Sequence, residues 1–418
     1  MSSPKTVQQL FDLVVRSELL TKQEIEKYLL QREAENEKFS DASAMCSGMV
    51  RDHLLTHFQA KLLMQGRWKN FFLKGKYKVL EHLGAGGMGT VFLCEHRHMR
   101  RKVAIKVLPP DRVDSATLMR FQREAQAIAM LNHTNIVRAF DIEQEGSLNF
   151  LVMEYIDGVS MQHLVEHLGP LPIPRAVNYL CQAANGLQHA HQKGLVHRDI
   201  KPSNLMLDFL GVIKLLDLGL ARFTNPMDNS EITMAGGSSP TVLGTADYLS
   251  PEQARDSTVD HRADIYSLGA VFYYFLTGQP PFHGGNVAMK LVRHQSEKPK
   301  RVDQVRSGIP VGIADVVSLM LEKSPNARPQ QPKDVIRYLE PWLVDVEPPT
   351  PDEVPENRFS LNRELASMSK ASTVSLMSHS GRTFILKTTD TQQHMSILSA
   401  PGVRIESSPA SHYPSTPK

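Results

Sequence analysis

An excess of cysteine and an excess of charge are both missing from this sequence. Its three cysteines, Cys46, Cys94 and Cys181, are odd in number and widely spaced among 418 residues. They exclude a disulfide framework or a CxxC metal site and favour a reducing compartment. Forty-seven Lys and Arg against 44 Asp and Glu leave a formal net charge of +3, so the chain as a whole is not expected to bind nucleic acid.

Long apolar runs are missing as well. No segment approaches the ~18 consecutive apolar residues that a membrane span requires. The first residues, Met1–Lys5, lead into charged, periodic sequence rather than the apolar stretch of a signal peptide. We therefore expect a soluble, cytoplasmic protein without a membrane span. At roughly 150 residues per domain, the length predicts two to three domains.

Composition divides the chain into three zones: residues 1–72, 73–343 and 344–418. In the first zone Thr21 and Glu24 form a capping-box pattern, and apolar residues recur at helical spacing. The apolar residues at this spacing include Val7, Leu10, Phe11 and Val14. A second such stretch, residues 54–66, ends at a glycine. This predicts a helical N-terminal extension, and we favour a small bundle packed on the neighbouring domain over a partner-binding module.

The last zone, residues 344–418, lacks the composition of a packed core. Of its 75 residues, 28 are Ser, Thr or Pro, so little apolar surface is present to offset the entropy of ordering the chain. We predict a disordered tail, with a short strand over residues 383–386. Whether the tail or the N-terminal helices bind protein partners is left open by the sequence.

The middle zone opens with two strand-like stretches, residues 77–83 and 90–94, separated by the glycine-rich stretch Gly84–Gly89. A dinucleotide-binding fold requires a helix after such glycines, whereas here a strand follows. The stretch is therefore predicted to be a hairpin. Its glycines suit either the close approach of backbone amides to phosphates or an ordinary turn, and this stretch alone does not separate the two.

A lysine interrupts the next apolar strand, residues 102–107. Alternation along the strand places Lys106 on the same face as Ala104, and a buried ammonium group requires an anionic partner. Glu124, in the helical stretch of residues 118–128, is the candidate partner. The alternative is that both are solvated surface charges, which is the usual environment of Lys and Glu.

Two further motifs complete a pattern. His197-Arg198-Asp199 is followed by Lys201 and Asn204, and Asp217-Leu218-Gly219 begins 18 residues after Asp199. In this order, and after the glycine-rich hairpin and the strand lysine, the motifs resemble those of protein kinases. The segments Gly86–Gly89, Asp157–Ser160 and Ser250–Ala254 resemble most the eukaryotic-like Ser/Thr protein kinases of bacteria. The kinase resemblance covers residues 77–343.

The resemblance implies a two-lobed α+β fold, in which a small antiparallel sheet with one helix and a larger helical lobe hold ATP between them. In phosphoryl transfer most of the catalysis is positioning and neutralisation of charge. By this resemblance Lys106, held by Glu124, contacts the α- and β-phosphates, and Lys201 steadies the γ-phosphate. Asp199 orients the substrate hydroxyl and accepts its proton. Asn204 and Asp217 bind Mg²⁺.

An adenine slot and a hinge are implied in the same way. Val91, Ala104, Leu83 and Met206 line the slot, and the end of the strand over residues 150–155 supplies a hydrogen-bonding edge. Plain core packing explains the same apolar residues, and both interpretations can hold. The full set implied to bind ATP is Leu83, Gly84, Ala85, Gly86, Gly87, Met88, Gly89, Val91, Ala104, Lys106, Met153, Glu154, Tyr155 and Met206.

Residues 220–250 resemble an activation segment. Glu252 and Arg328 resemble the ion pair that anchors its end, and Asp264 resembles the aspartate that supports the catalytic-loop backbone. We expect Thr241 to be autophosphorylated and its phosphate to bridge nearby arginines. The competing acceptors are Thr233, Ser238 and Ser239, and the arginines are Arg120, Arg198 and Arg222.

Three positions depart from the commonest kinase pattern. Leu218 replaces Phe, Ser250 replaces Ala, and Ser160 stands where some kinases have an acidic ribose contact. None of these changes removes a catalytic group. The predicted function is therefore Mg-ATP-dependent phosphorylation of Ser and Thr hydroxyls on proteins, including the chain itself. The complete catalytic set disfavours a pseudokinase scaffold, and the strand after Gly89 disfavours a nicotinamide-dependent oxidoreductase.

Overall fold

The computed structural model describes residues 3–86, 89–108, 115–217, 246–255, 259–354, 375–377 and 383–385. The chain separates into two units, Met1–Pro355 and Glu356–Lys418. Within the described ranges, no helix combines the length and the apolar character that crossing a membrane demands.

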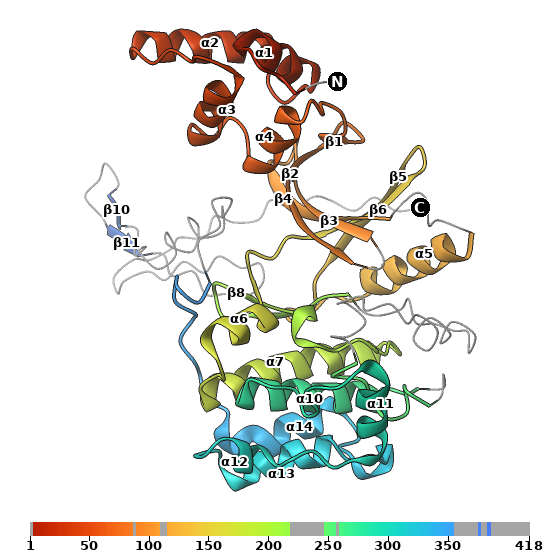
Figure 1. Ribbon diagram of the computed structural model, residues 1–418. Helices are drawn as coiled ribbons and strands as arrows, with labels where there is room; N and C mark the ends of the chain where they lie inside the picture. Colours follow the sequence, from red (N-terminus) through yellow and green to blue (C-terminus); the bar gives the residue numbers. More distant parts are fainter. Residues whose placement is uncertain are drawn as a thin grey trace, which may run out of the picture. The chain divides into compact units, whose positions relative to one another are not determined.

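The first unit begins with four helices that share a hydrophobic core (Figure 1). They are α1 (Val7–Arg16), α2 (Lys22–Ala34), α3 (Ala42–Arg51) and α4 (His57–Met64). The predicted periodicity of the first zone is confirmed, because Leu10, Val14 and Ile25 are fully buried. We refer to α1–α4 as the helical unit.

Local capping explains where these helices begin. At α2 the Thr21 hydroxyl accepts from the Glu24 N–H, and the Glu24 carboxylate accepts from the Thr21 N–H at 2.7 Å, as the capping-box pattern predicted. The sequence analysis did not predict α3. Its signal was present, because Met45 and Met49 lie one helical turn apart and are both fully buried.

An antiparallel sheet follows, with strand order β1-β2-β3-β4-β6-β5. Its strands are β1 (Phe72–Leu73), β2 (Tyr77–Gly86), β3 (Gly89–His96), β4 (Arg101–Val107), β5 (Ala139–Glu145) and β6 (Leu148–Glu154). The two predicted strands and the hairpin between them are therefore confirmed. Helix α5 (Ser115–Ala129) packs on this sheet, with Phe121 and Ala125 buried against Leu151 of β6.

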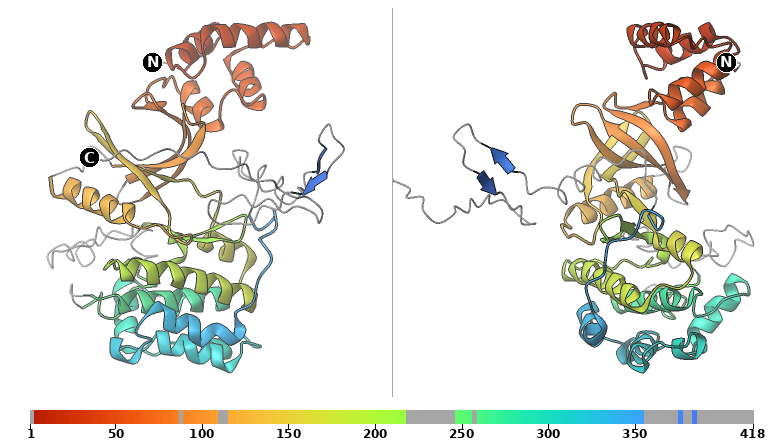
Figure 2. Two further views of the ribbon diagram at one scale, coloured as in Figure 1. Left: turned by 180° about the vertical axis from the view of Figure 1, so that it is seen from behind. Right: turned by 90° about the vertical axis from the view of Figure 1, so that its left-hand side faces the viewer.

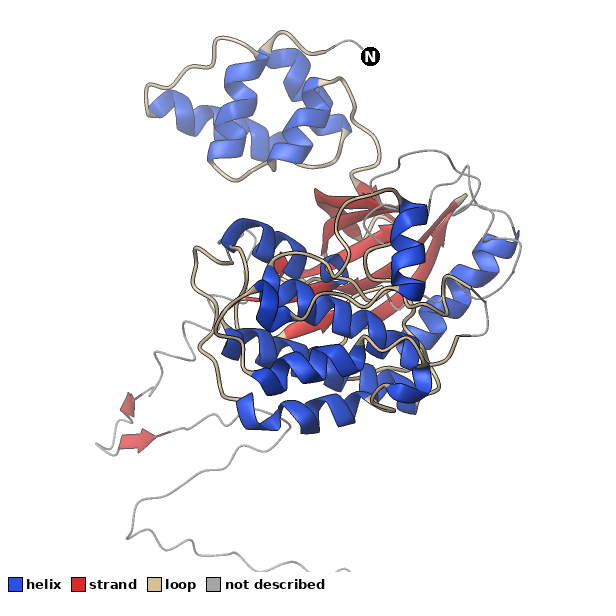
Figure 3. Cartoon of the chain, turned by 60° about the horizontal axis from the view of Figure 1, so that its bottom comes forward, coloured by secondary structure: helices blue, strands red, loops and turns tan. Residues whose placement is uncertain are grey.

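The helical lobe follows the sheet. Figure 1 shows its helices below the six-stranded sheet, and in Figure 3 they lie in front of the strands. Its helices are α6 (Met161–Leu168), α7 (Ile173–Gln192), α10 (Arg262–Thr277), α11 (Val287–Ser296), α12 (Val302–Val305), α13 (Val311–Met320) and α14 (Pro332–Leu339). Short 3-10 turns occur at η2 (Pro202–Asn204), η4 (Pro325–Ala327) and η5 (Glu340–Trp342). The predicted two-lobed α+β fold is confirmed.

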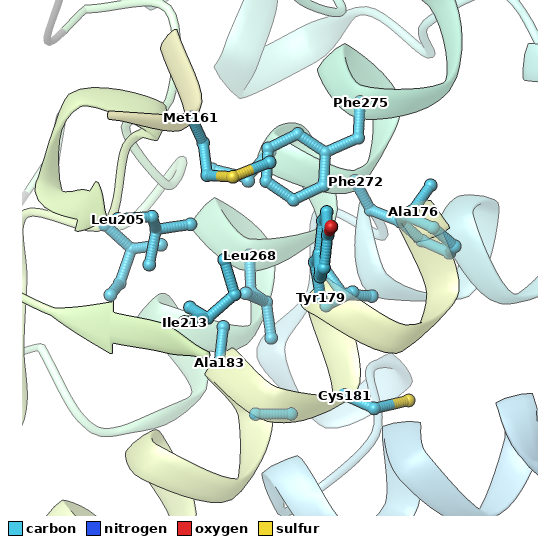
Figure 4. Packing of buried hydrophobic residues seen from close by; sticks show 14 of the residues in the cluster. Met161, Ala176, Tyr179, Cys181, Ala183, Leu205, Ile213, Leu268, Phe272 and Phe275 are labelled. Carbon is cyan, nitrogen blue, oxygen red and sulfur yellow. The ribbon is translucent and has the colours of Figure 1, made fainter. Parts of the chain in front are cut away.

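The core of the helical lobe forms around α10, which is buried from Ala263 to Leu276. Figure 4 shows Phe272 and Phe275 of α10 packing near Tyr179 of α7 and Met161 of α6. Helices α7 and α10 run side by side in both views of Figure 2. A second, three-stranded sheet of order β7-β8-β9 contributes Leu205 and Ile213 to the same core. Its strands are β7 (Gly158–Ser160), β8 (Leu205–Asp208) and β9 (Ile213–Leu215).

The beginning of the predicted tail is packed rather than free. Val354 is 2% exposed within the core of the helical lobe. Glu353 forms an ion pair with Arg175, and the Val344 carbonyl accepts from Asn178 at 3.0 Å. Ordered structure thus continues beyond the boundary expected at residue 343, because the Val344 carbonyl and the Glu353 side chain bind residues of α7. The domain boundaries themselves stay a prediction.

In the second unit, β10 (Ser375–Met377) pairs antiparallel with β11 (Thr383–Ile385). The strand predicted over residues 383–386 is confirmed over its described part. The rest of the predicted disordered tail lies outside the described residues.

Candidate active site

The catalytic loop, residues 197–204, carries three of the predicted site residues and is anchored by Asp264 at the start of α10. One carboxylate oxygen of Asp264 accepts from the backbone N–H of His197 at 2.8 Å, and the other accepts from that of Arg198 at 2.7 Å. His191, near the end of α7, contacts the carboxylate at 2.7 Å. The predicted supporting role of Asp264 is confirmed.

The environment of Asp264 keeps it charged. Its side chain is almost fully buried, and burial raises the pKa of a carboxyl group. The contacts with His191 and with the loop N–H groups more than offset this and hold the pKa of Asp264 below its usual value. Hydrogen bonds to an ionised acceptor are roughly twice as strong as neutral ones, so Asp264 supports the loop more strongly than a neutral acceptor would.

Arg198 takes a backbone conformation that needs such support. Its φ is +64°, in the left-handed region that non-glycine residues seldom occupy. Asp264 holds the peptide N–H of Arg198, and the amide nitrogen of Gln253 donates to the carbonyl oxygen of Arg198 at 2.7 Å. Both main-chain polar groups of this strained residue are therefore fixed.

Gln253 is a supporting residue that the sequence analysis missed. Its side-chain oxygen accepts from the hydroxyl of Ser250 at 3.0 Å and from the backbone N–H of Ser250 at 3.1 Å. These bonds aim the amide nitrogen at Arg198. Ser250 therefore does more than stay small where kinases more often have Ala: its hydroxyl orients Gln253. The signal in the sequence was a Ser and a Gln three residues apart after a predicted loop.

The side chains of the catalytic loop converge on Asp199. Lys201 Nζ lies 2.8 Å from Asp199 Oδ2, and Asn204 Nδ2 donates to the same oxygen at 3.0 Å. Asn204 Nδ2 also donates to the Asp199 carbonyl at 2.8 Å. The carboxylate of Asp199 thus has one oxygen fixed by a cation and an amide, which sets the direction of the other oxygen.

Lys106 and Asp217 connect the six-stranded sheet to the helical lobe. Lys106 Nζ on β4 donates to Asp217 Oδ1 at 2.7 Å, across 111 residues of sequence. The lysine side chain is 7% exposed and the aspartate side chain 47% exposed. Partial desolvation raises the pKa of this half-exposed carboxylate, but the ammonium group of Lys106 outweighs it, and the pKa of Asp217 lies below its usual value. Asp217 is therefore held as a carboxylate.

The expected partner of Lys106 was Glu124. Glu124 belongs to α5, but its side chain lies outside the described part of the structure, as does that of Arg120. The pairing therefore stays a prediction. Burial of Lys106 is confirmed, so the alternative of a solvated surface lysine is wrong.

The residues implied to bind ATP come from neighbouring strands. Across the β2–β3 and β3–β4 ladders, Gly84 pairs with Val91 and Val91 pairs with Lys106. Across β4–β6, Ala104 pairs with Met153. Met206 lies on β8 of the small sheet. Strand pairing therefore brings together the described members of the set on β2, β3, β4 and β6, whereas Met206, on the second sheet, and Tyr155, in a loop, lie outside these ladders. Leu83 on β2 is exposed.

Two glycines of the hairpin have different structural needs. Gly89 has φ +143°, and a Cβ there would collide with the carbonyl oxygen of Val107, so glycine is required by the fold. A Cβ on Gly84 would have no heavy atom within 4 Å, so the fold gives no steric reason for glycine there. Gly87 and Met88 lie outside the described residues.

Glu154, at the end of β6, has contacts that the sequence did not predict. Its carboxylate pairs with Lys214 of β9 at 2.9 Å, and its backbone N–H donates to the Arg138 carbonyl at 2.9 Å. Both contacts hold the chain where it passes from the sheet to the helical lobe. Tyr155, the next residue of the expected hinge, follows directly in the loop before β7.

The end of the expected activation segment is anchored as predicted. Arg328, whose side chain is fully buried, binds the two carboxylate oxygens of Glu252 at 2.6 and 2.8 Å. The remaining residues of this segment that the sequence singled out lie outside the described ranges: Leu218, Gly219, Arg222, Thr233, Ser238, Ser239 and Thr241.

Comparison with known proteins agrees with this geometry. The family model described as the protein kinase domain matches residues 77–338. The chain is 40% identical over 263 residues to the serine/threonine-protein kinase PknB of Mycobacterium leprae, covering 62% of this chain and 41% of that protein. It is 35% identical over 264 residues to the serine/threonine-protein kinase PrkC of Bacillus subtilis, covering 63% of this chain and 40% of that protein.

The matched region spans about two fifths of the length of these curated relatives. The family match contains strands β2 to β6, the catalytic loop and nearly all of the helical lobe, and it begins at Tyr77, the first residue of β2. The resemblance predicted from the motifs, to the eukaryotic-like Ser/Thr kinases of bacteria, is thereby confirmed. With a family match over more than half of its residues, the chain belongs to the protein kinase family.

Proposed function

We propose that this kinase transfers the γ-phosphoryl group of Mg-ATP to serine and threonine hydroxyls of proteins. The proposal rests on the contacts that hold two carboxylates of the predicted site. Asp199 is held by Lys201 and Asn204, and Asp217 is held by Lys106. Family membership supplies ATP as the phosphoryl donor.

Asp199 is the residue we assign to the substrate hydroxyl. Lys201 and Asn204 both bind its Oδ2, so Oδ1 is the oxygen proposed to orient the hydroxyl and to accept its proton as the new O–P bond forms. In the same step the bond from the γ-phosphorus to the bridging oxygen breaks, and ADP leaves. Lys201 is proposed to neutralise charge on the transferred group, since its ammonium already lies beside Asp199.

Lys106 is proposed to bind the α- and β-phosphates. The lysine side chain is 7% exposed, and its ammonium group pairs with a half-exposed carboxylate, so little water competes with an anion for this cation. The expected pair with Glu124 would fix the same ammonium from α5. Gly84 supports a phosphate site nearby, because the fold itself leaves open space where its Cβ would be.

The oxygen donors present also fit a magnesium ion. Asp217 offers an ionised carboxylate, and both hydrogen bonds from the Asn204 side chain come from its amide nitrogen. Its amide oxygen is therefore not used by either bond. Mg²⁺ prefers such hard oxygen ligands and is often held by one or two of them together with substrate phosphates. When bound, the ion would neutralise phosphate charge. We propose Asn204 and Asp217 as its ligands.

Transfer of radiolabel from [γ-³²P]ATP to a generic protein substrate tests the proposal. Lys106→Met and Asp199→Asn are each expected to lower the rate by about 10²–10³, because each removes one preorganised electrostatic contact. Lys102→Met, on the same strand and partly exposed, is the matched control and is expected to keep the wild-type rate. Hydrolysis of the product should yield phosphoserine or phosphothreonine. Near-wild-type transfer by either site variant contradicts the assignment.

The domain division, the cellular compartment and the phosphorylation of Thr241 are proposed as well. Residues 1–72, 73–343 and 344–418 are proposed as extension, catalytic domain and tail, with 344–354 packed on the catalytic domain. All three cysteines are free and buried, which supports a reducing, cytoplasmic compartment. Autophosphorylation of Thr241 is proposed on the resemblance alone. Mass spectrometry of the protein expressed by itself, beside its Asp199→Asn form, tests it: phosphate on Thr241 in both forms, or in neither, contradicts it.

A further inference from the structure

Two side chains at the start of helix α4 form hydrogen bonds to the strand that leads into the glycine-rich hairpin. The Thr56 hydroxyl donates to the carbonyl oxygen of Leu80 at 2.5 Å, and the Gln59 amide nitrogen donates to the carbonyl oxygen of Val79 at 2.6 Å. Gln59 is 1% exposed. Figure 1 shows α4 beside β2. Two side chains from one end of a helix thus fix two consecutive carbonyls of β2.

These carbonyls belong to an irregular point of the strand. In the β2–β3 ladder Val79 pairs with Cys94 and Glu81 pairs with Leu93, so the register skips Leu80. The extra residue of such a bulge is left without a partner in the ladder, and the strand bends there. The Thr56 hydroxyl supplies a partner for the Leu80 carbonyl. A buried carbonyl without a hydrogen bond is costly. The hydrogen bond from Thr56 therefore stabilises the bulge.

The helix also contacts the other strand of the hairpin. The ring of Phe58 lies 6.2 Å, centroid to centroid, from the ring of Phe92 on β3, and both pack on the hydrophobic core of the sheet. Both strands of the hairpin, β2 and β3, therefore contact α4 or its N-cap residue, and the hairpin extends beyond these contacts to Gly86. At about 3.3 Å per residue, six residues from Leu80 to Gly86 span roughly 20 Å. The β2–β3 register shifts a second time between His82 and Gly84, so this part of the strand is irregular at two points, and a change of bend at Leu80 displaces the hairpin beyond it.

The chemistry of Gln59 separates its contact with β2 from ordinary capping. Three helices of the unit carry a capping box, with Gln9, Glu24 and Gln59 as the reciprocating residues. Glu24 shows that a carboxylate serves this role as well as an amide does. Gln59 uses its oxygen for the cap, at 3.0 Å from the Thr56 N–H, and its nitrogen for Val79. The nitrogen has no capping duty, so the need for an amide here comes from the strand.

The geometry points to Thr56 and Gln59 as positioning residues for ATP binding: through the β2 bulge, the helical unit sets where the glycine-rich hairpin lies over the ATP phosphates. The inference rests on the proposed function, because it assumes that the hairpin covers ATP. Contacts that hold the hairpin act equally on bound substrate and on the transition state. Their loss therefore raises KM for ATP and leaves kcat nearly unchanged.

The substitution Gln59→Glu isolates the contact. It keeps the capping oxygen and sets a carboxylate oxygen against the Val79 carbonyl in place of the amide donor. In the full chain we expect KM for ATP to rise at least about three- to tenfold, because the loss of one neutral hydrogen bond is the lower limit when a buried carboxylate faces a carbonyl, with kcat within about twofold. Gln9→Glu is the matched control. Gln9 has the same capping role in α1 but is exposed, so KM and kcat should both stay at wild-type values.

A second pair keeps the test decisive if Gln59→Glu fails to fold. Thr56→Val removes the hydroxyl at nearly constant shape, whereas Thr56→Ser retains it. A raised KM for ATP in Thr56→Val, restored in Thr56→Ser, supports the inference. Equal KM values in Thr56→Val, Thr56→Ser and the wild type, or a fall in kcat alone, overturn it. A wild-type protein that transfers no phosphate, or an Asp199→Asn form that transfers normally, would instead refute the proposed function.

Discussion

The catalytic loop and the glycine-rich hairpin are held in opposite ways. The loop is fixed from within its own lobe, by Asp264 and Gln253, which together occupy both main-chain polar groups of Arg198. The hairpin strand is fixed from outside the sheet, by Thr56 and Gln59 of a helix that precedes it in the chain. The residues that support the catalytic loop lie within the family match, whereas the residues that support the hairpin strand lie outside it.

The chemistry of the two supports also differs. Asp264 is a buried carboxylate that accepts two backbone hydrogen bonds and contacts His191. Thr56 and Gln59 make neutral hydrogen bonds to carbonyls. Charge-assisted hydrogen bonds are the stronger kind. Breaking the inner support is therefore expected to cost more activity than breaking the outer one, and to act on kcat rather than on KM.

Asp264→Asn is the largest expected effect. The amide places an N–H₂ group against one of the two backbone N–H donors, so one of them loses its acceptor and the strained Arg198 loses support. We expect kcat to fall about 10²-fold, the scale of one lost preorganising contact, with KM for ATP within about twofold. Steady-state kinetics measure both, and Asp315→Asn, which is exposed, is the control. A wild-type kcat would show that the anchor is not needed.

Gln253→Leu should have an intermediate effect. It removes one neutral hydrogen bond to the Arg198 carbonyl while keeping the size of the side chain, so we expect kcat to fall about three- to tenfold. Ser250→Ala removes the hydroxyl that donates to the Gln253 oxygen but keeps the backbone N–H that donates to the same oxygen, and should cost less than Gln253→Leu. The comparison of the two kcat values checks the order. An equal or larger loss in Ser250→Ala would mean that Gln253 is not the residue that acts on the loop.

Glu143 ties the connection between the helical unit and β2 to the sheet. Burial raises its pKa, but hydrogen bonds from Lys76, Lys74 and Tyr77 outweigh this and lower the pKa from 4.5 to about 2. A carboxyl with a depressed pKa contributes stability that is complete above its unfolded value and is lost as the pH falls towards its folded value.

Glu143→Gln is therefore expected to lower Tm by a few °C at pH 7. The difference in Tm between Glu143→Gln and the wild type should narrow as the pH falls from about 5 towards 2, the range set by the unfolded and folded pKa values of Glu143. Thermal unfolding of both proteins across this range is the measurement. A Tm difference that stays constant with pH would mean that the charge of Glu143 does not stabilise the segment between the helical unit and β2.

The smallest expected effect is the coupling between the two supports. Gln59 and Gln253 contact different elements, β2 and the catalytic loop, and share no partner. Effects of independent sites add within roughly 0.3–0.5 kcal/mol. The double variant Gln59→Glu with Gln253→Leu should therefore show the KM of the first and the kcat of the second. A double variant no worse than one single variant would mean that both act on one shared element.

The motifs predicted several supporting contacts correctly, whereas the catalytic and ATP-binding roles of the motif residues stay predictions. Lys106 is buried, Asp264 holds the loop, and Glu252 pairs with Arg328, all as expected from the order of motifs. The same reasoning placed Lys106 beside Glu124 and did not anticipate its contact with Asp217. That contact joins two lobes, and no local pattern encodes the distance between them.

The missed supports depend on tertiary structure in a similar way. Gln59 is visible in the sequence only as a helix cap, and its second contact exists because β2 carries a bulge at Leu80. Gln253 matters because Arg198 has an unusual φ. Neither the bulge nor the strained residue leaves a periodic signal. The packing of Val354 was likewise hidden by the polar composition around it.

Steady-state kinetics of the wild type, Gln59→Glu and Gln253→Leu, measured side by side with ATP as the varied substrate, test the central comparison most directly. The account predicts that Gln59→Glu raises KM for ATP at nearly constant kcat, and that Gln253→Leu lowers kcat at nearly constant KM. If both substitutions change the same kinetic parameter, the two loops are not held by separate supports, and the account is contradicted.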